Sequence, residues 1–273
     1  MELWQAALLG LVEGLTEYLP VSSTGHLIVA QRALGIEASA ASNAYAICIQ
    51  GGAIAAVALL YRERVAQILR GIAGSDPAGR RLFLRVSVAF LPAAVLGVLF
   101  DDWIEQKLFG LWPIVFAWAA GGLAILALSR RATTRQGTHG IEQLSFQAAF
   151  AIGCIQCLAM WPGTSRSLAT ILGGVLAGLS LAGALEFSFL LGLVTLGAAT
   201  AYKALDDGAT MVEQVGWSAI LVGFAVAALS AWASVRWMVG YLQARGLALF
   251  GWWRLALAGL VAALLLSGAW EAA

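Results

Sequence analysis

Two carboxylates, Glu13 and Glu17, lie four residues apart in an apolar segment. At this spacing both side chains leave the same face of a helix. Two unpaired carboxylates within a membrane are costly, so we expect a divalent cation, an arginine or a shared proton to compensate them. Carboxylate oxygens suit Mg²⁺ or Ca²⁺, which commonly bridge protein carboxylates and phosphate oxygens. The alternative is a structural polar contact between two membrane segments.

Hydroxyl groups and a histidine follow directly, as Ser22, Ser23, Thr24 and His26. If a helix restarts near Ser23 or Thr24, its free backbone N–H groups form a natural anion site. His26 lies three residues beyond Ser23, close enough to accept the serine proton or to bond a phosphoryl oxygen. A structural histidine is the alternative. The other histidine, His139, lies in a basic segment and is interpreted as solvated.

An arginine, Arg166, lies in a second polar interruption of an apolar stretch. A guanidinium in this position needs an anionic partner, and its planar fork matches phosphate oxygens. We therefore predict a phosphate-binding turn that also includes Gly163, Thr164, Ser165, Ser167 and Thr170. There the helix dipole and backbone amides would act on the same anion as the arginine. A salt bridge from Arg166 to Glu13 or Glu17 is a second interpretation, compatible with the first.

Composition places this chemistry in a membrane. Of the 273 residues, 61% are hydrophobic and 11% are charged, and the mean hydropathy is +0.85. Soluble domains carry about a quarter charged residues. Continuous apolar runs predict an all-α polytopic membrane protein, and nothing between Met1 and Pro20 indicates a cleavable signal peptide. The net charge of +1 provides no basic surface for nucleic acid.

Six segments are predicted as full spans, at about 42–61, 82–100, 112–129, 182–201, 217–239 and 253–270. The segments 62–81, 130–144 and 240–252 carry the basic residues, with Arg245 and Arg254 assigned to the flanks of the last one. The positive-inside rule therefore puts these segments in the cytoplasm and both termini outside.

Two further stretches, 3–36 and 145–178, are apolar but are broken near their middle by proline and polar residues. Such backbone is tolerated at membrane depth only where protein buries it or where it lines a cavity. Each stretch is therefore predicted to be a re-entrant helix–loop–helix hairpin.

The two hairpins resemble each other: Gly10-Leu11-Val12-Glu13 precedes Pro20, and Gly153-Cys154-Ile155-Gln156 precedes Pro162. About three spans follow each hairpin, and the loop charges predict opposite starting sides. We therefore expect a single membrane domain built as an inverted-topology repeat, about 1–129 and about 145–270. In this architecture sites lie where broken helices meet near the midplane.

The run Glu-Gly-Leu-Thr-Glu-Tyr-Leu-Pro-Val-Ser-Ser-Thr-Gly-His at 13–26, together with Pro-Gly-Thr-Ser-Arg-Ser at 162–167, resembles the bacterial undecaprenyl-diphosphate phosphatase family, also called bacitracin-resistance proteins. Glu-Phe-Ser-Phe-Leu-Leu at 186–191 matches too, so the resemblance covers nearly the whole chain. Three positions depart from the family pattern: Leu168 replaces a usual glycine, Gly51 a common leucine, and the span after Glu186 lacks a frequent proline. These departures put local packing and substrate preference in doubt.

The resemblance implies hydrolysis of undecaprenyl diphosphate to the monophosphate, which recycles the lipid carrier for peptidoglycan synthesis. It implies a bacterial inner-membrane enzyme that depends on Mg²⁺ or Ca²⁺, with an inverted-repeat fold and an active site that opens toward the periplasm. The family's functional positions correspond to Glu13, Glu17, Ser23, Thr24, His26, Ser165, Arg166 and Thr170. The oligomeric state stays open, with a homodimer as one alternative.

Three mechanisms remain open for an in-line attack on the terminal phosphorus. Ser23 could attack with His26 as base and Glu17 as orienting group, His26 could attack directly, or a metal-activated water could attack. A lipid-phosphate transporter is the alternative function, because inverted repeats with broken helices are common in transporters. A phosphatidic-acid-type phosphatase is disfavoured, because no second histidine follows Arg166. Glu186 is expected either to border the site or to bond a helix terminus.

Overall fold

The computed structural model describes residues 1–37, 39–132 and 137–271, without the side chains of 101–102, 105–106 and 128–132. The described residues form α-helices and two short 3₁₀ helices, η1 (Ile141–Gln143) and η2 (Cys157–Met160), with no strand. The α-helices are α1 (Leu3–Thr16), α2 (Ser23–Ala33), α3 (Ala40–Leu60), α4 (Arg62–Ile72), α5 (Pro77–Leu108), α6 (Leu111–Ala132), α7 (Phe146–Gln156), α8 (Arg166–Leu176), α9 (Leu181–Asp206), α10 (Gly208–Val215), α11 (Trp217–Arg245) and α12 (Ala248–Leu266).

Within the described residues, five helical segments are long and apolar enough to cross a membrane: Ala40–Leu60, Pro77–Phe100, Leu181–Asp206, Trp217–Arg245 and Ala248–Leu266. They coincide with five of the six predicted spans, and the prediction of an all-helical, multi-spanning protein is confirmed. The sixth predicted span, 112–129, falls in α6. Its apolar segment, Leu111–Ala127, is shorter than these five.

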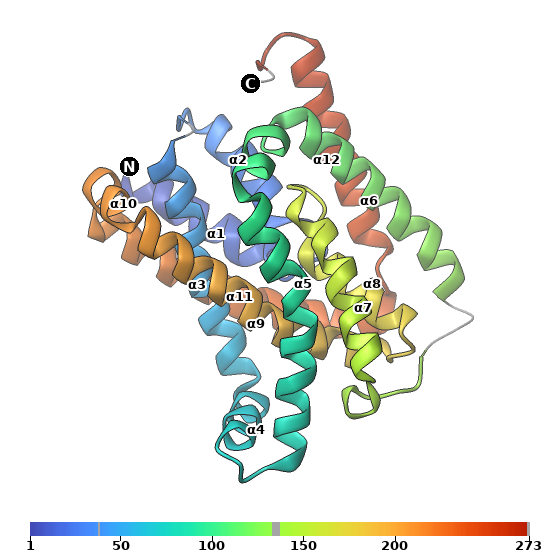
Figure 1. Ribbon diagram of the computed structural model, residues 1–273. Helices are drawn as coiled ribbons and strands as arrows, with labels where there is room; N and C mark the ends of the chain where they lie inside the picture. Colours follow the sequence, from blue (N-terminus) through green and yellow to red (C-terminus); the bar gives the residue numbers. More distant parts are fainter. Residues whose placement is uncertain (38, 133–136, 272–273) are drawn as a thin grey trace.

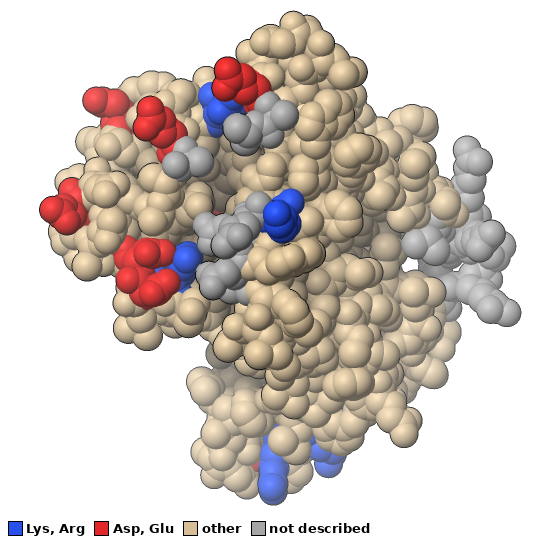
Figure 2. Space-filling view, turned by 45° about the horizontal axis from the view of Figure 1, so that its top comes forward, with Lys and Arg blue, Asp and Glu red and all other residues tan. Residues whose placement is uncertain are grey.

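Charged side chains gather toward the ends of the molecule. Helix α4 and the adjoining end of α5 project at one end, and the C-terminus lies at the opposite end (Figure 1). In Figure 2 basic side chains lie at the α4 end, acidic side chains gather toward the other end with some basic ones beside them, and a broad area without charge lies between. This arrangement fits the predicted basic segment at 62–81. Residues 133–136 of the second predicted basic segment lie outside the described residues.

Both apolar stretches break at the positions that their proline and polar residues predicted. Helix α1 ends at Thr16 and α2 begins at Ser23, and η2 ends at Met160 before α8 begins at Arg166. The N-cap residues are Ser22, with φ 74°, and Ser165, with φ 75°. They are the only non-glycine residues with positive φ in the described parts of the chain. Such backbone persists only where the surrounding structure fixes it, which is typical of functional sites.

Glycines let the first helix of each hairpin approach another helix closely. Helix α1 packs against α11, and a Cβ at Gly10 would lie 2.4 Å from the carbonyl oxygen of Gly223. Helix α7 packs against α5, and a Cβ at Gly153 would lie 2.3 Å from the carbonyl oxygen of Ala89. These backbone contacts set the position of both hairpins in the bundle.

The Gly10 contact predicts a position-specific loss of stability. We expect Gly10→Ala to destabilise the protein by about 1–3 kcal/mol, because the new methyl group meets rigid backbone. The control is Gly240→Ala in α11, where a Cβ has no atom within 4 Å. Thermal unfolding in detergent measures both, and equal midpoints for the two variants would contradict the packing described.

Candidate active site

The tips of the two hairpins contact each other. The Gly163 backbone N–H donates to Ser22 Oγ at 3.1 Å, and Ser167 Oγ donates to the Leu19 carbonyl oxygen at 2.9 Å. Each tip precedes a helix whose first N–H groups have no partner within the helix. Two helix N-termini, with their partial positive charge, therefore begin at one junction.

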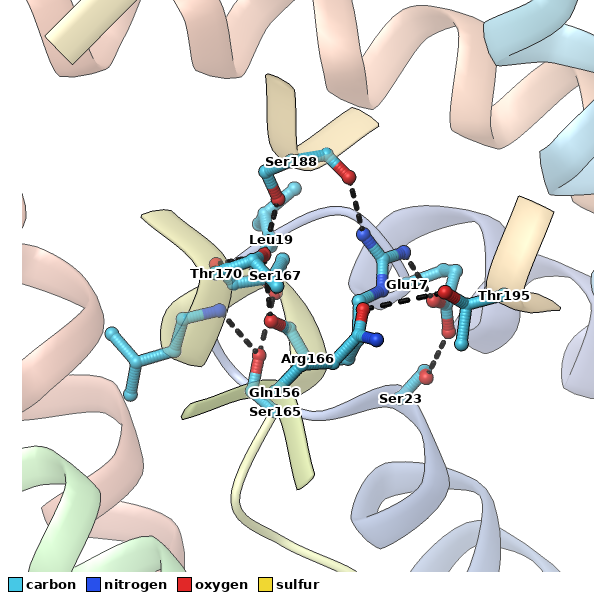
Figure 3. Close-up of polar contacts among 11 residues, drawn as sticks. Glu17, Leu19, Ser23, Gln156, Ser165, Arg166, Ser167, Thr170, Ser188 and Thr195 are labelled. Carbon is cyan, nitrogen blue, oxygen red and sulfur yellow. Dashed lines mark hydrogen bonds and ion pairs between the residues drawn. The ribbon is translucent and has the colours of Figure 1, made fainter. Parts of the chain in front are cut away.

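Glu17 connects the two hairpins at this junction (Figure 3). Its Oε2 accepts a hydrogen bond from Ser23 Oγ, and its Oε1 forms a 3.1 Å salt bridge with Arg166 Nη2. Arg166 Nη1 donates to the Ser188 carbonyl oxygen at 3.0 Å, and its guanidinium carbon lies 5.3 Å from the centre of the Tyr18 ring. The salt bridge is largely buried, with 9% of the Arg166 side chain and 5% of the Glu17 side chain exposed. Of the two sequence interpretations of Arg166, the structure thus contains the ion pair.

Unused hydrogen-bonding capacity remains beside this ion pair. Within the described residues, both carboxylate oxygens of Glu13 and the Nε of Arg166 are buried without a hydrogen-bond partner. Glu13 is fully buried and interacts electrostatically with Glu17 and Arg166. Buried polar groups without partners are unfavourable, so the junction is suited to bind further charged groups.

The donor set suits a hard cation that shares its coordination with substrate. Glu13 and Glu17 offer carboxylate oxygens, and no cluster of three or more histidine, cysteine or acidic residues occurs in the described parts of the chain. Mg²⁺ is usually held by one or two carboxylates, with waters and substrate phosphates as the other ligands. The two glutamates therefore fit such an ion.

His26 does not contact Ser23 as the spacing predicted. Its Nδ1 lies 2.7 Å from the Ser22 carbonyl oxygen, and its Nε2 accepts from Trp253 Nε1 at 3.0 Å. This pattern puts the proton on Nδ1. His26 lies about one turn beyond the start of α2, and its ring is directed toward Trp253 of α12. Ser23, at the start of the helix, is directed toward Glu17. The predicted Ser23–His26 hydrogen bond is therefore replaced by Ser23–Glu17.

The hydroxyls predicted to bind phosphate lie around the junction. Ser165 Oγ accepts from the Leu168 N–H at 3.2 Å and lies 3.0 Å from Ser167 Oγ. Thr170 Oγ1 donates to the Arg166 carbonyl oxygen at 2.9 Å. Ser167 and Thr170 are fully buried, whereas Thr164 is half-buried and Thr24 exposed. The phosphate-binding roles of these hydroxyls stay predictions.

Other residues reach the junction without having been predicted. Tyr18 and Ser188 contact Arg166, and they lie in the runs 13–26 and 186–191 that carry the family resemblance. Trp253 and Arg254 belong to α12, far along the chain, where no local pattern indicates a role. The prediction that Arg254 flanks the basic segment 240–252 is wrong, because the residue lies inside α12 and its side chain is fully buried.

Glu186 lies away from the junction. Its Oε1 accepts from Arg64 Nε at 2.6 Å, and Arg64 also pairs with Glu142 at 2.8 Å. Arg64 belongs to α4, at the basic end of the molecule. Among the described residues, Glu186 thus forms a side-chain ion pair with Arg64 in the first turn of α4, rather than a bond to the backbone of a helix terminus.

The sequence matches a known family and curated relatives over most of its length. Residues 6–260 match the model of the family described as bacitracin resistance protein BacA. The chain is 46% identical over 261 residues to an undecaprenyl-diphosphatase of Sorangium cellulosum, which covers 94% of this chain and 85% of the relative. It is 42% identical to the undecaprenyl-diphosphatase of Azotobacter vinelandii, over 93% of this chain and 92% of the relative. The protein therefore belongs to the bacitracin resistance protein BacA family.

The indole donor of Trp253 predicts a change in histidine reactivity. We expect Trp253→Phe to speed the modification of His26 by diethyl pyrocarbonate, because Nε2 loses the hydrogen bond that occupies its lone pair. Mass spectrometry of the peptide that contains His26 measures the rate. His139, the other histidine of the chain, provides the internal control. An unchanged His26 rate would contradict the assigned hydrogen bond.

Proposed function

We propose that this protein hydrolyses undecaprenyl diphosphate to undecaprenyl phosphate and phosphate, in the bacterial inner membrane. One observation carries the proposal. At a junction of two helix N-termini, the Glu17 carboxylate accepts a hydrogen bond from Ser23 of its own hairpin and forms a salt bridge with Arg166 of the other hairpin. A hydroxyl, an acceptor for its proton and a cationic fork are the parts that phosphoryl transfer needs. The curated relatives named undecaprenyl-diphosphatase support the choice of substrate.

In the mechanism that the geometry favours, Ser23 attacks the terminal phosphorus while Glu17 accepts its proton. A bond forms between Ser23 Oγ and phosphorus, the bond to the bridging oxygen breaks, and undecaprenyl phosphate leaves. Water then hydrolyses the phosphoserine and releases phosphate. Arg166 stabilises the charge that develops on the phosphoryl oxygens. His26 is the weaker nucleophile here, because both of its ring nitrogens are already hydrogen-bonded.

The proposal includes a divalent cation, Mg²⁺ or Ca²⁺, held by Glu13 and Glu17. When bound, the ion would neutralise phosphate charge as a Lewis acid. The unpartnered oxygens of Glu13 support this assignment, because a fully buried carboxylate requires a compensating group.

We also propose a membrane topology of six spans and two re-entrant hairpins, arranged as an inverted repeat with the site open toward the periplasm. Both hairpins place a serine with positive φ nine residues beyond their buried polar position, Glu13 to Ser22 and Gln156 to Ser165. The equivalent glycine contacts of α1 and α7 also support the repeat.

An apolar groove supports a lipid substrate. A cavity of about 480 Å³ lies beside the first hairpin, lined by Leu15, Leu19, Val21, Trp237 and Trp253 among others. Trp253 connects it to His26 and hence to the junction. We propose that the groove binds the part of the prenyl chain nearest the diphosphate, while the rest of the chain lies in the bilayer.

Phosphate release tests the function directly. Purified protein in detergent is expected to release phosphate from undecaprenyl diphosphate, and Arg166→Ala to lower kcat at least ~100-fold by removing charge stabilisation. Ser87→Ala in α5 is the control, because among the described residues its hydroxyl bonds only the Phe83 carbonyl oxygen of its own helix. If phosphate release is absent and proteoliposomes show lipid-phosphate flux, the transporter alternative replaces this proposal.

Covalent catalysis predicts a phosphorylated Ser23. Acid quenching during turnover of substrate labelled with ³²P on the terminal phosphate should trap label on the wild type. Ser23→Ala should carry no label and release no phosphate. Phosphate release at the wild-type rate by Ser23→Ala, with no label trapped on the wild type, would instead establish direct attack by water.

Metal removal should abolish turnover reversibly. We expect a chelator to stop phosphate release, and Mg²⁺ or Ca²⁺ to restore it. Glu13→Gln keeps the size of the side chain but removes a charged ligand, so it should raise the ion concentration needed for half-maximal activity by about tenfold or more. Full activity of the wild type in the presence of chelator would contradict the proposed metal site.

A further inference from the structure

Arg254 is a fully buried cation within α12. All of its hydrogen bonds go to backbone carbonyl oxygens: Trp118 at 3.5 Å, Pro20 at 3.3 Å, Thr164 at 3.0 Å, Ala117 at 2.9 Å and Gly163 at 2.7 Å. An arginine has five N–H donors, so each is used once. Across the described parts of the chain, no carboxylate lies within salt-bridge distance of it.

The five carbonyls belong to three separate segments that meet at the candidate active site. Pro20 lies in the tip of the first hairpin, Gly163 and Thr164 lie in the tip of the second, and Ala117 and Trp118 lie in α6. Trp118 adds a further tie, because its Nε1 donates to the Val21 carbonyl oxygen at 3.1 Å. One side chain from α12 therefore fixes both hairpin tips relative to each other.

The orientation of these carbonyls determines the orientation of the neighbouring amides. In a trans peptide the C=O and the N–H of one unit point in opposite directions. Because the Thr164 carbonyl faces Arg254, the Ser165 N–H faces away from it. The residues that follow the tied carbonyls, Ser165 and Arg166, are the start of helix α8 in the candidate active site.

Burial of a cation without an anionic partner is costly, and a structural link could be made by a neutral donor. Gly121 is adapted to the guanidinium, because a Cβ there would lie 2.2 Å from Arg254 Nη2. We propose that Arg254 is a positioning residue for diphosphate hydrolysis, which sets the spacing of the two hairpin tips and adds positive charge behind the phosphate site. This inference rests on the proposed function.

The first test replaces the guanidinium fork. Arg254→Lys keeps the charge but has three N–H donors, so it ties at most three of the five carbonyls. We expect kcat to fall about 100-fold, because small misplacements of catalytic groups have effects of that size, while KM changes less than about threefold. Arg245→Lys, at an exposed arginine of α11, is the matched control.

A second variant displaces the guanidinium without changing it. Gly121→Ala should lower kcat in the same manner. Gly259→Ala in α12, where a Cβ has no atom within 4 Å, should leave kcat unchanged. Wild-type kcat in both Arg254→Lys and Gly121→Ala would overturn the proposal.

Hydrogen exchange gives a readout that is independent of catalysis. In Arg254→Lys we expect faster amide exchange in peptides that cover 17–25 and 161–167, and unchanged exchange in 181–206. Unchanged exchange at both tips overturns the positioning role, whether or not the wild type hydrolyses the lipid. Loss of cooperative unfolding in both variants also overturns it, because Arg254 would then act in folding alone. If the wild type releases no phosphate but both tips loosen, Arg254 still sets the spacing of the tips, and it is the proposed hydrolysis that fails.

Discussion

The ion pair between Glu17 and Arg166 is the interaction on which the rest of the site depends. It joins two helical hairpins that lie about 150 residues apart in the chain. Both side chains are largely buried away from water. In such surroundings neither charge is tolerable alone, so the pair enforces the meeting of the hairpins. The same carboxylate orients Ser23, and the same guanidinium contacts Ser188 and Tyr18. Glu17 and Arg166 thus both hold the hairpins together and form part of the proposed active site.

Much of this site could be predicted from sequence because lipid penalises polar groups severely. Pro20, Pro162 and the hydroxyl runs around them conflict with an uninterrupted span, so the helix breaks were predictable. Glu13, Glu17 and Arg166 were conspicuous for the same reason, and their pairing was one of two interpretations. The predicted spans matched wherever an apolar run was long and uniform.

What sequence could not supply were contacts between distant segments. His26 and Trp253 are 227 residues apart, and only the folded bundle decides that the imidazole bonds the indole rather than Ser23. Arg254 shows a different limit. An arginine near a predicted span end has the same pattern whether its side chain extends to the membrane surface or turns inward. Five carbonyls from three segments bind its side chain, and nothing in the sequence around Arg254 indicates these partners.

The position of Arg254 in the chain has a consequence for biosynthesis. The junction contacts described above come from α1, α2, α6, α8, α9 and the segments between them, whereas Arg254 and its neighbour Trp253 belong to α12, which leaves the ribosome after all of these. Until α12 is inserted, the carbonyls of both hairpin tips lack their donor in an apolar medium. A nascent chain that has not yet inserted α12 therefore holds two hairpin tips without this donor, and insertion of α12 fixes them relative to each other.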